Sequence, residues 1–172
     1  MRMIVLMLVL LCFLLGCSNG TVIPMSRISY DSSDTNKIVI IEIADDSEPI
    51  FELYGSGLVR RRKDIFQEEF ESGNLSEKQI KQLLNHLINK QRVGDLGSYY
   101  PENIIPGIEM YPNSELSLKI RIDGFYKQIQ FAYSNVGGEL DYFREEERID
   151  EETFKELDRL RSVFQYLMEY KY

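Results

Sequence analysis

Residues 114–133 read SELSLKIRIDGFYKQIQFAY, and this stretch decides the fold. Asp123-Gly124 between two alternating runs is a strong signal for a two-residue β-hairpin turn. Pairing across that turn brings apolar side chains together on one face, as Ile122 with Phe125, Leu118 with Ile129 and Leu116 with Phe131. Polar side chains meet on the other face, as Arg121 with Tyr126, Lys119 with Gln128 and Ser117 with Gln130. Lys127, opposite Ile120, is the exception to this pattern.

A sheet with one apolar face and one polar face is covered on one side and wet on the other. Further strands precede the hairpin. Residues 37–44, KIVIIEIA, form a nearly continuous β-branched run, which is typical of a strand that is central in its sheet or buried on both faces. Residues 50–54 and 58–63 flank Gly55-Ser56-Gly57, and these glycines predict a second hairpin because they adopt positive φ at little cost.

Two amphipathic helices are predicted to cover the apolar face. The first begins after the N-cap Ser76, with Gln79 completing a capping box, and its apolar stripe comprises Ile80, Leu83, Leu84, Leu87 and Ile88. The second repeats this pattern after Asp150, and its stripe comprises Phe154, Leu157, Leu160, Phe164, Leu167 and Met168. The sequence therefore predicts a single α+β domain over residues 37–172, a two-layer structure in which two helices pack on one face of an antiparallel β-sheet.

The first seventeen residues have the pattern of an export signal. One cation, Arg2, precedes an apolar run from Met3 to Leu15. This run is shorter than the about 20 residues that a membrane-spanning helix needs. The junction Leu14-Leu15-Gly16-Cys17 resembles the lipobox of bacterial lipoproteins. That resemblance implies a signal peptide over residues 1–16, cleavage before Cys17, and acylation of the thiol and of the new amino terminus. The alternatives are an ordinary signal cleavage site beside an incidental thiol, or an uncleaved segment that stays as an anchor.

Acylation would determine where the protein resides. The mature chain is then expected in the cell envelope, held to a lipid bilayer through Cys17 and facing the periplasm or the outside, because two or three acyl chains anchor a protein stably. Cys12 leaves with the leader, so Cys17 is the only other cysteine and no internal disulfide is predicted. Residues 17–36, rich in Ser, Thr, Asn and Asp, are predicted to be a flexible lipidated tether.

The chain is acidic, with 20 Lys and Arg against 28 Asp and Glu. Removing the leader takes Arg2 and no acidic residue, which makes the formal charge of −8 one unit more negative. That balance argues against nucleic acid, or an anionic bilayer over a broad face, as a partner, because both require a cationic footprint. It permits a basic partner, although an acidic surface also simply keeps a protein soluble.

Two groups of residues are candidate surface contacts. Arg60, Arg61 and Arg62 form a cationic run that suits phosphate, sulfated glycan or acidic head groups, or they are an ordinary surface strand end. Tyr99, Tyr100 and Tyr111 lie in a long irregular connection, residues 94–113. A tyrosine has an apolar ring with a polar tip, so these side chains suit a glycan or protein partner, or else close the open end of the core.

Catalytic motifs are missing from the sequence. The mature chain has one histidine, His86, and lacks a G-x-S-x-G elbow, a phosphate-binding loop and paired metal-ligand spacing. Because His86 lies off the apolar stripe of its helix, we expect it to face solvent. The sequence therefore predicts no enzyme, no cofactor and no metal site.

The function hypotheses follow from these features. The order of strands, YGSG turn, capped helix, tyrosine-rich connection and second hairpin is similar to that of small uncharacterised secreted or lipid-anchored bacterial proteins, a resemblance that implies no activity. The leading hypothesis is a membrane-anchored envelope lipoprotein that acts as a non-enzymatic binding or accessory module, with a protein or glycan of the envelope as its partner. The alternative is an inhibitor or immunity protein that neutralises a secreted basic toxin or hydrolase.

Replacing Cys17 tests the anchor. Cys17→Ser lacks the thiol that forms the thioether, so we expect an unacylated precursor that keeps residues 1–16. Intact-mass measurement of the wild type and the variant checks this. A wild-type protein that is cleaved normally and carries no acyl chain would contradict the prediction.

Overall fold

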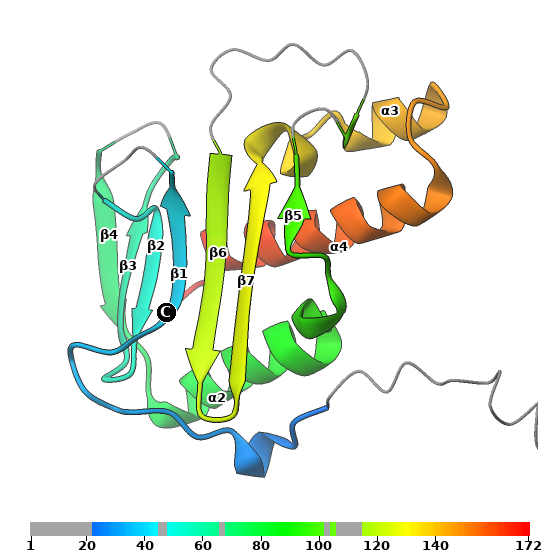
Figure 1. Ribbon diagram of the computed structural model, residues 1–172. Helices are drawn as coiled ribbons and strands as arrows, with labels where there is room; N and C mark the ends of the chain where they lie inside the picture. The colour runs from blue at the N-terminus through cyan, green and yellow to red at the C-terminus, as the bar shows by residue number, and fades with distance from the viewer. Residues whose placement is uncertain (1–21, 45–47, 66–67, 102–103, 106–114) are drawn as a thin grey trace, which may run out of the picture.

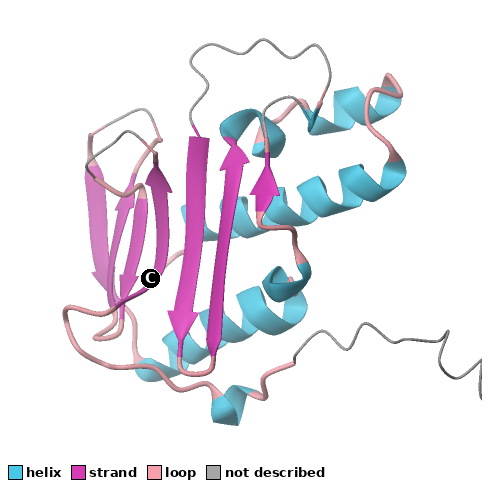
Figure 2. Ribbon diagram, viewed as in Figure 1, coloured by secondary structure: helices cyan, strands magenta, loops and turns pink. Residues whose placement is uncertain are grey.

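The computed structural model describes residues 22–44, 48–65, 68–101, 104–105 and 115–172 (Figure 1). Within them the chain forms one seven-stranded sheet whose strands lie side by side in the order β4 (Phe70–Asn74), β3 (Leu58–Arg62), β2 (Phe51–Tyr54), β1 (Lys37–Ile43), β6 (Glu115–Ile122), β7 (Phe125–Ala132) and β5 (Tyr99–Tyr100). The longer helices are α2 (Glu77–Asn85) and α4 (Glu151–Met168). Figure 2 shows them on the same side of the sheet, so the α+β class and the two-layer arrangement are confirmed.

The β6–β7 hairpin has the predicted register. Ile122 pairs with Phe125, Leu118 with Ile129 and Leu116 with Phe131, and every predicted polar pair is also present. Gly124 occupies the turn with a φ of +72°, a conformation that glycine adopts without strain. The apolar members of these pairs belong to the core that α2 and α4 close, and the ring of Phe131 meets that of Phe164 edge to face. The alternation of apolar and polar side chains along β6 and β7 therefore determines which face of the sheet the helices cover.

Strand β1 is central in the sheet, as its β-branched sequence predicts. It pairs antiparallel with β2 on one side and with β6 on the other, and its side chains Val39 and Ile41 are fully buried. The β2–β3 hairpin is also confirmed. Gly57 has a φ of +100° in its turn, and Gly55 lies so close to the backbone of Asp31 that a side chain would not fit there.

Both helices begin as the sequence predicts. Ser76 accepts a hydrogen bond from the Gln79 backbone and the Gln79 side chain accepts one from the Ser76 backbone, which completes the capping box of α2. Asp150 accepts from the backbone N–H groups of Glu152 and Thr153 at the start of α4. Five of the six residues in the predicted α4 stripe are buried. Val163 is buried as well, whereas Met168 is only partly covered.

The sheet is mixed rather than purely antiparallel. Strand β5, inside the connection that the sequence predicts to be irregular, pairs parallel with β7. A strand of two residues is too short to show an alternating pattern, so sequence periodicity cannot reveal it. The structure also adds a short helix, α3 (Leu140–Glu145), and the short 3₁₀ helices η1 (Met25–Arg27), η3 (Val93–Asp95) and η5 (Tyr133–Val136). Helix α2 continues directly into a π-helical segment, η2 (His86–Lys90).

Residues 22–36 are part of the folded domain, so the prediction of a tether as far as residue 36 is wrong. Ile23 and the side chain of Asn89 exchange two hydrogen bonds, of 2.9 Å and 2.6 Å. The Asp123 backbone N–H donates to the carbonyl of Ser29 at 2.9 Å, and Ile28 is buried in the core. Isolated apolar residues in a polar segment show no period, and their distant partners are invisible to sequence patterns.

The buried helix stripe should dominate stability. We expect Leu84→Ala and Leu157→Ala each to lower the free energy of unfolding by about 2 to 5 kcal/mol, because both side chains are fully buried in the core. Gln82 is exposed on the same helix as Leu84, so Gln82→Ala is the matched control and should change stability little. Denaturant titration measures all three variants, and equal effects of Leu84→Ala and Gln82→Ala would contradict the stripe.

Candidate functional site

The face of the sheet opposite α2 and α4 carries a row of aromatic and amide side chains. We call Tyr99, Ser117, Tyr126, Gln128 and Gln130 the open-face strip. These residues pair across β5, β7 and β6, so they share the face opposite the buried Phe131. The rings of Tyr99 and Tyr126 are 60% and 62% exposed. Two large exposed rings therefore lie on one face, with amide groups between them.

Hydrogen bonds organise the strip. The Tyr126 hydroxyl donates to Oε1 of Gln128 at 2.7 Å, and Nε2 of Gln128 donates to Oγ of Ser117 at 3.4 Å. Two cations of β6 lie beside the strip: Lys119, opposite Gln128, is neutralised by Glu42 on β1, whereas Arg121, opposite Tyr126, is exposed. The side chains of the strip itself are polar and uncharged, which suits an uncharged polar ligand.

The three tyrosines predicted to form one surface have different positions. Tyr99 is exposed on the strip, whereas Tyr100 is buried and points toward α4. The Tyr100 hydroxyl donates to Glu156 at 3.0 Å and accepts from the Gly97 N–H at 2.6 Å, and burial raises its pKa. Tyr100 therefore closes the core, and Tyr111 lies outside the described residues. Sequence reasoning missed Tyr126, although its outward position follows from the hairpin register.

The predicted arginine contacts alternate between the two faces of β3. Arg60 pairs with Glu52 at 3.2 Å on the open face. Arg61 lies on the helix side, where it pairs with Glu71 at 2.8 Å and donates to the Tyr170 carbonyl at 2.9 Å. Arg62 is buried and donates to the Glu48 carbonyl at 2.9 Å. Each guanidinium thus has partners within the chain, and the three do not share an exposed face.

A buried carboxylate explains part of this arrangement. Glu52 is buried on the open face, where it meets Lys37 at 2.5 Å as well as Arg60. Its hydrogen bond raises the pKa of Lys37. A buried carboxylate requires such partners, because removing its charge from water is costly. The cation of Arg60 therefore belongs to the sheet's internal packing.

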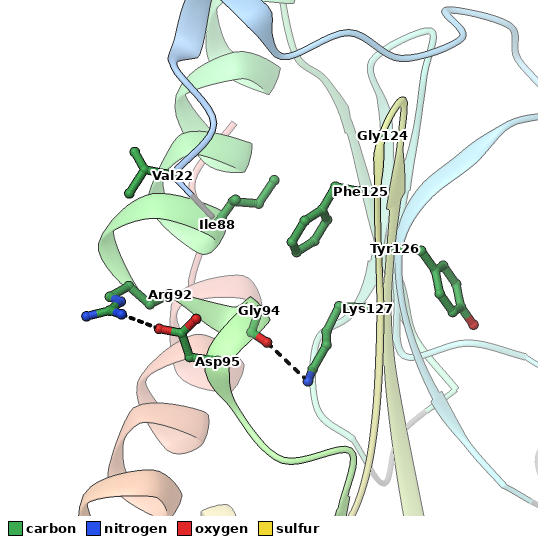
Figure 3. A pocket seen from close by; sticks show the side chains of 9 residues that line it. All are labelled: Val22, Ile88, Arg92, Gly94, Asp95, Gly124, Phe125, Tyr126 and Lys127. Carbon is green, nitrogen blue, oxygen red and sulfur yellow. Dashed lines mark hydrogen bonds and ion pairs between the residues drawn. The ribbon is translucent and has the colours of Figure 1, made fainter. Parts of the chain in front are cut away.

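A small cavity of about 240 Å³ lies between the tip of the β6–β7 hairpin and the end of η2 (Figure 3). Figure 3 shows Phe125 and Lys127 pointing from β7 toward the helices, and Tyr126 pointing away. The Lys127 amine donates to the carbonyls of Gly94 and Leu96, and burial lowers its pKa. These bonds explain how a lysine is accommodated on the apolar face. The cavity is smaller than the about 300 Å³ at which ligand pockets usually begin.

The prediction that His86 faces solvent is wrong. Its ring stacks on Tyr166 of α4 with centroids 3.9 Å apart, and its Nε2 lies 3.2 Å from the Gln91 amide. Burial is the main cause that lowers the pKa of His86. The contact of η2 with α4 covers a position that helical periodicity alone places outside. Among the described residues, no three His, Cys, Asp or Glu side chains gather closely enough to hold a metal ion.

The lowered pKa of His86 predicts a pH effect on stability. Folding favours the neutral ring, so the folded state loses stability as pH falls below the unfolded-state pKa of about 6.5. His86→Phe keeps a ring against Tyr166 without the titration. We expect the wild type to lose stability relative to this variant between pH 7.5 and 5.5, measured by denaturant midpoints at a series of pH values. If the denaturant midpoints of the wild type and of His86→Phe changed in parallel with pH, the lowered pKa of His86 would be contradicted.

The chain matches no known protein family, no curated protein and no solved structure. Within the described residues, no helix is both long enough and apolar enough to cross a bilayer.

Proposed function

We propose that this protein is a membrane-anchored envelope lipoprotein whose folded domain is a non-enzymatic binding module, with the open-face strip as its contact surface. The lipobox-like Leu14 to Cys17 supports the anchor. The observation that carries the binding role is the pair of exposed rings, Tyr99 and Tyr126, on one side of a sheet whose other side is covered by helices. Exposed aromatic rings beside hydrogen-bonding groups are typical of contact surfaces.

The chemistry of the strip favours a glycan over a charged ligand. Tyr126 and Gln130 are four residues apart on β7, about 13 Å at the rise of a strand, and Tyr99 lies beside Gln130. Tyrosine rings stack on the apolar carbon faces of sugar rings, and the amides of Gln128 and Gln130 can bond to hydroxyl groups. The separation of the Tyr99 and Tyr126 rings suits an extended glycan chain that contacts both rings at once.

Removal of the two rings tests this role. We expect Tyr99→Ala/Tyr126→Ala to weaken binding to purified, protein-free envelope glycan by about 30-fold, at about 1 kcal/mol for each ring. Tyr142 is similarly exposed on α3, away from the strip, so Tyr142→Ala is the matched control and should bind like the wild type. Co-sedimentation with the insoluble glycan gives the affinities. Unchanged binding by the double variant would eliminate the strip as the contact surface.

A second candidate function is an inhibitor or immunity protein against a basic secreted toxin or hydrolase. The observation that favours it is the acidic turn between α3 and α4, where five glutamates are exposed: Glu145, Glu146, Glu147, Glu151 and Glu152. Acids at the start of α4 also stabilise that helix through its dipole, so this turn has a structural reason of its own. Two variants distinguish the two functions. If Glu145→Lys/Glu146→Lys lost binding to a basic partner protein while Tyr99→Ala/Tyr126→Ala retained it, the second function would be favoured over the first.

A further inference from the structure

The length of chain between the anchor and the folded domain limits how far the domain can lie from the membrane. Val22 is the first described residue, and it follows Cys17 by five positions. Five residues span at most about 18 Å even when fully extended. If Cys17 is acylated as proposed, the end of the domain that carries Val22 therefore lies close to the lipid head groups.

Contacts define which parts of the molecule share that end. Ile23 is hydrogen-bonded to Asn89 near the end of η2, and Ser29 is hydrogen-bonded to Asp123 in the β6–β7 turn. Val22 lines the small cavity together with Arg92 and Phe125, as Figure 3 shows. Figure 1 shows the hairpin tip and η1 at one end of the molecule and α3 at the opposite end. Three segments, residues 22–29, 86–97 and 121–127, thus meet beside the anchor.

The charge at this end is opposite to that of the whole chain. The three segments contain two carboxylates, Asp95 and Asp123, and five cations, Arg27, Lys90, Arg92, Arg121 and Lys127. All of these cations except Lys127 are exposed. Within the described part of the chain, neither Arg27 nor Arg121 forms an ion pair. A local cationic surplus on a protein of formal charge −8 is complementary to an anionic lipid surface.

Apolar side chains at the same end suit the membrane interface. Val22 is 66% exposed and Met25 is 43% exposed, and both lie in the segment that leads to Cys17. Apolar side chains surrounded by arginine and lysine are the composition of surfaces that rest in the head-group region of a bilayer. The cationic surplus ends near the β2–β3 turn, where Glu77 lines a depression with Ser56.

We infer that the surface formed by Val22, Met25, Arg27, Lys90, Arg92 and Arg121, the anchor-end surface, rests on an anionic phospholipid bilayer and fixes the orientation of the domain. This inference rests on the proposed acylation of Cys17. The negative charge of the whole chain opposes contact over a broad face, so contact is confined to this end. The short chain to Cys17, the electrostatic attraction and the two apolar side chains together hold the anchor-end surface against the bilayer.

Site-specific fluorescence quenching tests the orientation. The acylated full-length mature protein is reconstituted on vesicles of equal parts phosphatidylcholine and phosphatidylglycerol with brominated acyl chains. Because an acylated Cys17 has no free thiol, a single label can be placed at Ser26→Cys beside the surface, or at Tyr142→Cys on α3. We expect the label at position 26 to be quenched several-fold more than the label at 142. Raising NaCl from 0.1 M to 1 M, which shortens the Debye length from about 10 Å to about 3 Å, should reduce the difference.

Charge reversal supplies a matched control. Arg27→Glu/Arg121→Glu should reduce the difference between the two labels, as high salt does, whereas Lys155→Glu/Lys171→Glu, which changes the net charge equally at exposed positions elsewhere, should leave it unchanged. Equal quenching of both labels on vesicle-bound wild-type protein would overturn the orientation and leave the anchor intact. Protein that lacks acyl mass and stays in solution would overturn the anchor and the orientation together.

Discussion

The apolar core lies on one face of this sheet, and the rest of the structure depends on that constraint. Apolar side chains of β1, β2, β6 and β7, among them Val39, Leu118 and Ile129, lie on the same side of the sheet, and the stripes of α2 and α4 cover them. The main exception on the covered face, Lys127, is accommodated because its amine donates hydrogen bonds to two carbonyls near η3. Among the residues that the structure describes, no helix covers the opposite face, so tyrosine and glutamine side chains remain available there.

Sequence patterns predicted the elements whose determinants are local. The register across Asp123-Gly124 follows from a two-residue turn, and the capping box at Ser76 joins residues three positions apart. The α+β class follows from these elements because an alternating sheet and two amphipathic helices have a limited number of ways to bury their apolar sides.

The errors come from interactions between residues far apart in sequence. Ile23 meets Asn89 across 66 positions, and this contact makes part of the expected tether a structural segment. Arg61 meets the carbonyl of Tyr170 across 109 positions, so a run that reads as a cationic patch is divided between two faces of a strand. His86 is covered by a ring from α4. In the candidate site, Tyr99 was singled out as a surface contact and is exposed, whereas Tyr126, which the hairpin register places on the polar face, was not singled out.

The place of β1 in the sheet has a consequence for how the chain must fold. Its partner β2 follows within a few residues, but Glu42 on β1 meets Lys119 on β6 across 77 positions. Until β6 is available, the run Ile38 to Ile41 is an unpaired strand edge, β-branched and without charge, and such edges recruit other chains into aggregates. High contact order makes this pairing slow. The unfolded chain therefore passes through an interval in which intermolecular pairing competes with the arrival of β6, and protection of β1 during that interval favours a high yield of native protein.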